Sequence, residues 1–238
     1  MQRPTRGVQA VSGNESDDER PPRTDGRSTR WEAHRAERRE KIVDAALALL
    51  AEKGPEFGLE EVAARAGLSK PVIYRFFGDR ASLIDAMGDR ATNQLAQRMM
   101  PAIYAEVANR ARIRAVIGAF ICFLDESPNA YWLFARAASG TGGDVVRAHR
   151  EFVASALSGV LSEYIRSSGV EAPAEAENVW AYGLVGFVQS TAEWWLEHRT
   201  IGRDEVIEQL TTFVWVQVEG AARLYGLRLD PDSVFGAD

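Results

Sequence analysis

LEEVAARAGLSKPVIYRFFGDRASL, residues 59–83, contains two short helical patterns on either side of a glycine-centred turn. Leu59, Val62 and Ala66 recur at helical spacing, so one face of the first helix is expected to be buried. Gly67 allows the left-handed backbone conformation in which such a helix often ends. The stretch therefore predicts a helix–turn–helix, a motif whose second helix lies in the major groove of DNA.

The second helix of this motif carries the signals of a helix start. Ser69 is a residue type that caps helices, and Pro71 is tolerated in a first turn because its missing N–H has no partner there. Ile73 is expected to hold this helix against the first one. Asp79 is then expected to cap a longer helix that follows at once.

Helical patterns continue through the rest of the chain, and strand-like alternation is nowhere sustained. The sequence predicts an all-α fold of about nine helices. One helix is expected at 33–53, before the motif, and the helix from Asp79 is expected to kink or end at Pro101. The remaining helices are expected at about 109–125, 129–138, 144–168, 173–198 and 203–225.

Composition divides the chain into four segments. Residues 1–30 are rich in Pro, Gly, Ser, Asp and Arg, so they are expected to form a disordered N-terminal arm. A three-helix domain that contains the DNA-binding motif is expected at 31–78, and a larger helical domain is expected at 79–228. Residues 229–238 would be a C-terminal tail.

Charge is unevenly distributed along the chain, whose net charge is −6. Residues 1–109 carry 17 basic and 17 acidic side chains, whereas residues 110–238 carry 11 and 17. Basic residues crowd at 35–41, where they can meet phosphate or can form an ordinary solvated helix face.

Several classes of protein are disfavoured. No apolar run approaches the ~18–20 residues that a membrane span needs, and the polar start is unlike a secretory signal. The single cysteine, Cys122, excludes an internal disulfide and fits a core position in a cytoplasmic protein. The three histidines are far apart and no catalytic motif is present, so we expect neither an enzyme nor a metal or cofactor site.

The motif and its surroundings resemble the TetR family of one-component regulators. The likeness rests on the helix before the motif, on AARAGLSKPVIYRFF at residues 63–77 and on the G-D-R that follows at 78–80. It implies a homodimer that reads a palindromic operator and binds a small molecule in each C-terminal domain. Gly58 departs from the family pattern, because it stands where a better-capping Thr is usual.

The resemblance also implies which side chains touch DNA. Lys70 could pair with guanine and Val72 with a thymine methyl group, while Tyr74 and Arg80 would meet phosphates. Two alternatives remain open here: a solvated Arg75 without a DNA contact, and a Pro71 that serves only to start the helix. The full set of expected DNA-binding residues is Arg38, Arg39, Ser69, Lys70, Pro71, Val72, Tyr74, Arg75 and Arg80.

The C-terminal half is rich in aromatic residues on expected helices, which suggests an apolar pocket between them. Few Lys or Arg fall in the apolar stripes, so an acyl, lipid or aromatic ligand is favoured over an anion. Each aromatic side chain can also simply fill the core. The expected pocket residues are Phe120, Phe123, Trp132, Phe187 and Thr191.

A dimer interface is expected between the last two helices of each subunit, as a four-helix arrangement. Small residues share one face of the helix at 173–198, which permits close approach either to a partner or within one subunit. The expected interface residues are Gly183, Gly186, Ser190, Leu210 and Val214.

The sequence thus predicts a cytoplasmic, homodimeric transcription regulator, a repressor that a small apolar effector releases from double-stranded operator DNA. Two alternatives remain: a DNA-binding regulator without an effector, and a helical lipid carrier or enzyme that keeps a decayed motif.

Overall fold

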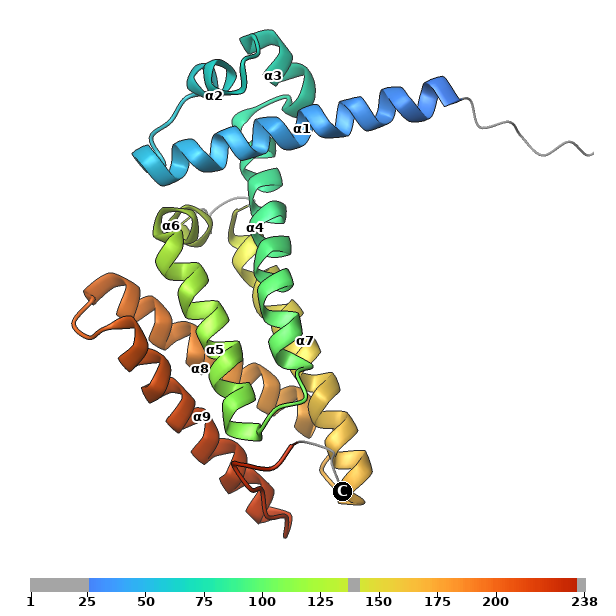
Figure 1. Cartoon of the computed structure of the whole chain (residues 1–238), viewed down its shortest axis with the longest axis vertical. Coiled ribbons are helices and arrows are strands. Elements are labelled where there is room, and N and C mark those ends of the chain that lie inside the picture. Colours follow the sequence, from blue (N-terminus) through green and yellow to red (C-terminus); the bar gives the residue numbers. More distant parts are fainter. Residues whose placement is uncertain (1–25, 137–141, 235–238) are drawn as a thin grey trace, which may run out of the picture. The chain divides into compact units, whose positions relative to one another are not determined.

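The computed structural model describes residues 26–136 and 142–234 of the chain (Figure 1). Within these residues the fold is all-α with nine helices, as predicted, and an isolated bridge between Ala108 and Val234 is the one strand-like pairing. The first four helices are α1 (Gly26–Lys53), α2 (Leu59–Ala66), α3 (Lys70–Phe77) and α4 (Arg80–Ile103). The others are α5 (Asn109–Glu126), α6 (Pro128–Arg136), α7 (Gly142–Ser168), α8 (Ala176–His198) and α9 (Arg203–Leu224).

α1 begins earlier than the sequence predicts. It includes residues 26–30, which were assigned to the disordered arm, whereas residues 1–25 lie outside the described part of the chain. A low apolar content argues against a core position, but it does not exclude helical structure. The chain divides into two compact units inside α1, residues 1–38 and 39–238.

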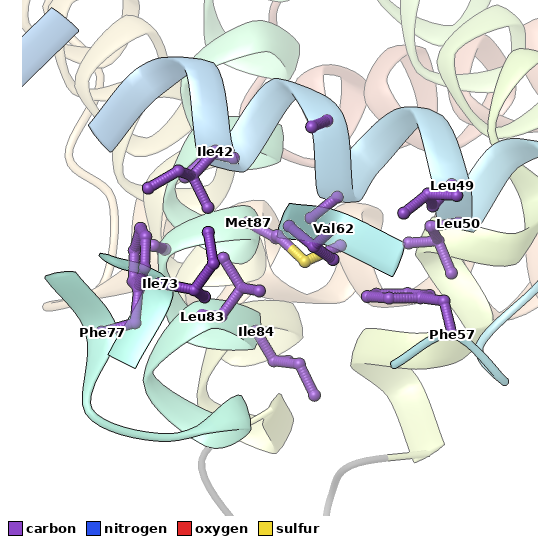
Figure 2. Packing of buried hydrophobic residues seen from close by; sticks show 14 of the residues in the cluster. Ile42, Leu49, Leu50, Phe57, Val62, Ile73, Phe77, Leu83, Ile84 and Met87 are labelled. Carbon is purple, nitrogen blue, oxygen red and sulfur yellow. The ribbon is translucent and has the colours of Figure 1, made fainter. Parts of the chain in front are cut away.

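The helix–turn–helix closes around a core to which α1 to α4 contribute, together with Ala130 and Phe134 of α6. Figure 2 shows Ile42 and Leu50 of α1 near Val62 of α2, with Ile73 of α3 and Met87 of α4 completing the cluster. All five side chains are buried. A predicted domain boundary at residue 78 therefore does not separate the packing, because α4 supplies the apolar face that closes this core.

The turns are formed as the sequence indicates. Gly67 has φ 66° and ψ 36°, the left-handed conformation, and follows the last turn of α2. Asp79 caps α4, since its carboxylate accepts a 2.8 Å hydrogen bond from the Ser82 N–H. Ser69 stands at the N-cap position of α3, but its side chain makes no capping hydrogen bond.

Gly67→Ala is expected to lower the free energy of unfolding by about 1 kcal/mol, because alanine tolerates a positive φ poorly. Open space surrounds the position of the added Cβ, so the effect should come from the backbone alone. Gly118→Ala, inside α5 and equally unobstructed, should instead raise stability by about 0.5–1 kcal/mol. Denaturant titration measures both; equal effects of the same sign would contradict this explanation.

The second half of the chain is a helical bundle in which α7 packs on α8, and α4 and α9 both pack on α5. Trp195 of α8 is 1 % exposed, and its indole N–H donates to the Ile201 carbonyl at 2.9 Å. α4 continues through Pro101 to Ile103 instead of ending at the proline. The proline has no N–H to continue the backbone hydrogen bonds of the helix, and α4 ends two residues after it.

Candidate nucleic-acid interface and interior cavity

The start of α3 is an exposed part of the helix–turn–helix. Ser69, Lys70 and Pro71 are exposed and Val72 is half-buried, whereas Ile73 and the residues packed around it fix the helix from behind. Because the Ser69 hydroxyl does not cap the helix, it can bind an outside partner. These four predicted DNA-binding residues therefore form one surface at the N-terminal end of α3.

Lys70 is held by a neighbouring helix. Its ammonium group lies 2.5 Å from a carboxylate oxygen of Glu60 on α2, and both side chains are largely exposed. This hydrogen bond raises the pKa of Lys70 and lowers the pKa of Glu60, because it favours the charged form of each group. Sequence reasoning missed Glu60, whose role depends on how α2 and α3 pack.

Tyr74 and Arg75 lie farther along α3 and are exposed. The Arg75 guanidinium is 6.0 Å from the centre of the Phe76 ring, so it is partly positioned by a cation–π contact. On α1, Arg39 is exposed and lies 5.2 Å from the centre of the Phe77 ring. Arg38 is exposed as well and belongs to the other compact unit.

Arg80, a predicted phosphate contact, is exposed and also makes contacts within its own subunit. One of its guanidinium nitrogens donates to the Pro55 carbonyl at 2.7 Å, and the group lies 5.4 Å from the Phe57 ring centre. Arg80 thus holds the loop between α1 and α2. Gly58 follows in this loop, and its N–H donates to the Glu61 carboxylate at 3.0 Å, which compensates for the weak cap.

An interior cavity of about 210 Å³ lies in the C-terminal bundle. Helix α4 contributes Leu95 and Met99 to its wall, and the predicted pocket residues Phe120 and Phe123 of α5 also line it. The other predicted pocket residues, Trp132, Phe187 and Thr191, are not on its wall. They are only partly buried, and Phe187 packs edge-on against Phe213 at 5.9 Å instead.

The wall also carries polar side chains that the sequence did not suggest. Two basic residues, Arg112 and Arg150, line the cavity, where the sequence predicted few. The Arg150 Nε–H donates to the Gln189 side chain at 2.8 Å. Burial and a hydrogen bond to Glu193 raise the pKa of Tyr131, so its hydroxyl stays neutral. Arg112 shares its helical face with Phe120 and Phe123, a periodicity that could have revealed it.

The predicted dimer residues separate into two groups. Gly183 and Ser190 of α8 are exposed and Gly186 is half-buried. Leu210 and Val214 of α9 instead lie in the core of their own subunit, which corrects their assignment to the interface. Helix α9 has a second apolar stripe that is exposed, formed by Phe213, Val216 and Leu224.

Comparison with known proteins agrees with these features. Residues 42–87 match a family described as bacterial regulatory proteins, tetR family. Residues 98–226, more than half of the chain, match the tetracyclin repressor-like C-terminal domain. The chain belongs to the TetR family. It is therefore a DNA-binding transcriptional regulator.

Two mycobacterial relatives cover most of this TetR-family chain. An uncharacterized HTH-type transcriptional regulator of Mycobacterium tuberculosis is 28 % identical over 205 residues, 86 % of this chain and 87 % of the relative. The HTH-type transcriptional activator FasR of Mycolicibacterium smegmatis is 30 % identical over 183 residues, 76 % and 83 % of the two chains.

A solved structure has the same fold. The tetR-family transcriptional regulator of Streptomyces coelicolor superposes with a TM-score of 0.64 at 28 % identity, over 79 % of this chain and 83 % of that one. Within the described residues, no helix is long and apolar enough to cross a membrane.

For a TetR-family regulator, the ion pair between Lys70 and Glu60 should affect how tightly random DNA is bound. Glu60→Gln removes a negative charge beside the recognition helix, so affinity for a non-operator duplex should rise about two- to fivefold. The salt dependence of binding should also steepen, because Lys70 can then release a counterion from a phosphate. Fluorescence anisotropy at several salt concentrations measures both effects.

Glu52→Gln is the matched control, because it removes the same charge from a pair with Arg65 that does not involve α3. If the two variants bind random DNA equally well, the effect is one of overall charge and not of Lys70.

Proposed function

We propose that the protein is a repressor that binds a palindromic operator as a homodimer and is released by a small apolar effector in the cavity. The supporting observation is that one helix, α4, belongs to both regions. Its first half, with Leu83 and Met87, packs in the helix–turn–helix core. Its second half, with Leu95 and Met99, lines the cavity. A ligand that prefers one position of α4 thereby changes operator affinity.

Dimerisation through α8 and α9 is part of this proposal. Phe213, Val216 and Leu224 are 55 %, 58 % and 84 % exposed and recur at helical spacing along α9. Exposed apolar residues gathered on one face of a helix are typical of a protein–protein interface. A dimer joined through this stripe would bind two operator half-sites whose centres are about 34–36 Å apart, or a multiple of that distance.

The direction of regulation is a separate part of the proposal. We propose repression, in which operator binding blocks transcription. The name of the relative FasR, a transcriptional activator, favours activation as the second candidate. A reporter gene placed behind an operator that the protein selects from random duplexes decides between repression and activation. Deleting the regulator should raise expression of the reporter, and a fall in expression would establish activation.

The effector class follows from the lining. Apart from its few polar groups, the wall consists of aliphatic and aromatic side chains from α4, α5, α6, α7, α8 and α9. Such a surface suits an acyl chain, a lipid or an aromatic molecule. Operator affinity should fall when one such compound is added, and insensitivity to a broad panel would favour a regulator without an effector.

Filling the cavity should abolish this response. Val116 lies on the cavity wall, so Val116→Trp is expected to leave operator binding within about twofold while eliminating effector-induced release. Trp132→Phe is the matched control, since Trp132 lies off the wall and its replacement should preserve the response. A gel-shift titration with and without effector measures both; a normal response of Val116→Trp would place the effector elsewhere.

A further inference from the structure

Asn109, the first residue of α5, is a buried polar residue on the cavity wall. Its side chain is 8 % exposed, although asparagine is usually found at the surface. The function of its two polar atoms can be assigned separately, because the amide nitrogen and the amide oxygen have different surroundings.

The amide nitrogen holds the end of the chain in place. It donates to the Asp230 carbonyl at 3.0 Å and to the Ser233 hydroxyl oxygen at 3.1 Å. The Asn109 backbone N–H donates to the Ser233 carbonyl at 2.9 Å, and the Arg110 N–H to the Pro231 carbonyl at 3.1 Å. Residues 227–234, which we call the C-terminal strap, thus satisfy the first N–H groups of α5. Leu229 of this strap also lines the cavity.

These contacts fix the orientation of the amide. The Asp230 carbonyl can only accept, so the nitrogen of Asn109 must face the strap and the oxygen must face away. The oxygen, Oδ1, is buried and has no hydrogen-bond partner among the residues that the structure describes. An unsatisfied buried acceptor costs about 1–3 kcal/mol, and native proteins rarely leave one without a partner.

We propose that Oδ1 of Asn109 accepts a hydrogen bond from a hydroxyl group of the effector, which would be an apolar chain bearing a hydroxyl at one end. The inference rests on the proposed ligand-binding role of the cavity. Arg112 lies one helical turn further along the same wall, and its guanidinium can only donate. A hydroxyl group suits both side chains, because it donates to Asn109 and accepts from Arg112.

The rest of the wall accommodates the chain of such a molecule. Ile113, Val116 and Phe120 continue the face of α5 on which Asn109 lies, and all three line the cavity. The face from Asn109 to Phe123 spans about 21 Å at 1.5 Å per residue. The hydroxyl would therefore sit at the end near the C-terminal strap, with the chain directed along α5 toward α6.

A pair of ligands that differ in one hydrogen-bond donor tests this inference. We would measure displacement of the fluorescent apolar probe N-phenyl-1-naphthylamine from the full-length protein by 1-decanol and by decyl methyl ether. The alcohol is expected to bind at least about tenfold more tightly, because the ether leaves Oδ1 unsatisfied. Equal affinities, tighter binding of the ether, or no displacement by either compound would each overturn the proposal.

Two variants test whether Asn109 causes the preference for the alcohol over the ether. Asn109→Leu should reduce the ratio of the two affinities to about one, whereas Ser233→Ala loosens the strap and should keep the wild-type ratio. An unchanged ratio in Asn109→Leu would assign the donor preference to another residue and overturn the proposal. If Asn109→Leu does not fold, the comparison of alcohol and ether on the wild-type protein decides alone.

Failure of the inference can be distinguished from failure of the proposed function. A clear preference for 1-decanol together with operator affinity that no apolar compound changes would uphold the Asn109 site and reject effector-controlled DNA binding. Release from the operator by other apolar compounds, without any preference for the alcohol, would reject the Asn109 site alone.

Discussion

Lys70→Ala should weaken operator binding by about 5- to 100-fold, as expected for a side chain that pairs with a base edge. Lys70 is exposed at the first position of α3, where a helix–turn–helix meets the major groove. Binding to a random duplex should fall less, so that specificity declines together with affinity. Gel-shift titrations with an operator selected by the wild-type protein from random duplexes measure both quantities.

Lys53→Ala is the control for this experiment, because Lys53 is an exposed lysine of α1 that pairs with Glu61 away from the start of α3. It should change operator affinity by less than about twofold. Tyr74→Ala should also weaken binding if the Tyr74 hydroxyl contacts a phosphate. Undiminished binding in both Lys70→Ala and Tyr74→Ala would refute the assignment of α3 as the recognition helix.

Phe213→Glu is expected to convert the dimer to a monomer. A carboxylate within the exposed apolar stripe of α9 would have to lose its water when two subunits meet. Operator affinity should then fall by about 100-fold or more, because each monomer binds one half-site and the gain from linking two sites is lost. Sedimentation velocity gives the oligomeric state, and gel shift gives the affinity.

Val107→Glu places the same charge on another exposed apolar residue, in the loop between α4 and α5. This variant should remain dimeric and keep its operator affinity. A Phe213→Glu protein that is still a dimer would place the subunit interface elsewhere than on α9.

The helix–turn–helix could be predicted in detail because its signals are local. Gly67 and Asp79 act within a turn or a single hydrogen bond of their own position, and the structure places both as the sequence indicates. The start of α1 could not be predicted in the same way. Its first turns bury no apolar stripe that would mark a boundary, and the compact unit that holds the core begins only at Arg39.

The cavity and the interface were predicted less well, because both depend on which of two helical faces turns inward. Helix α9 carries Leu210 and Val214 on one apolar stripe and Phe213 and Val216 on another. Periodicity finds both stripes but does not say which one the subunit buries. On α8, Phe187 was expected on the wall, but its neighbours Val188 and Gln189 line the cavity instead.

Because α4 is long, a small rotation at one of its ends produces a large displacement at the other. Its 24 residues extend for about 36 Å, from the end of the DNA-reading motif to the far end of the cavity wall. A tilt of only about 5° around its cavity end would move its first residue by roughly 3 Å, nearly the rise of one DNA base pair. In a dimer the displacements of the two subunits add. A ligand can therefore change the distance between the two recognition helices, so that it no longer matches the spacing of the DNA half-sites, without rearranging the bundle.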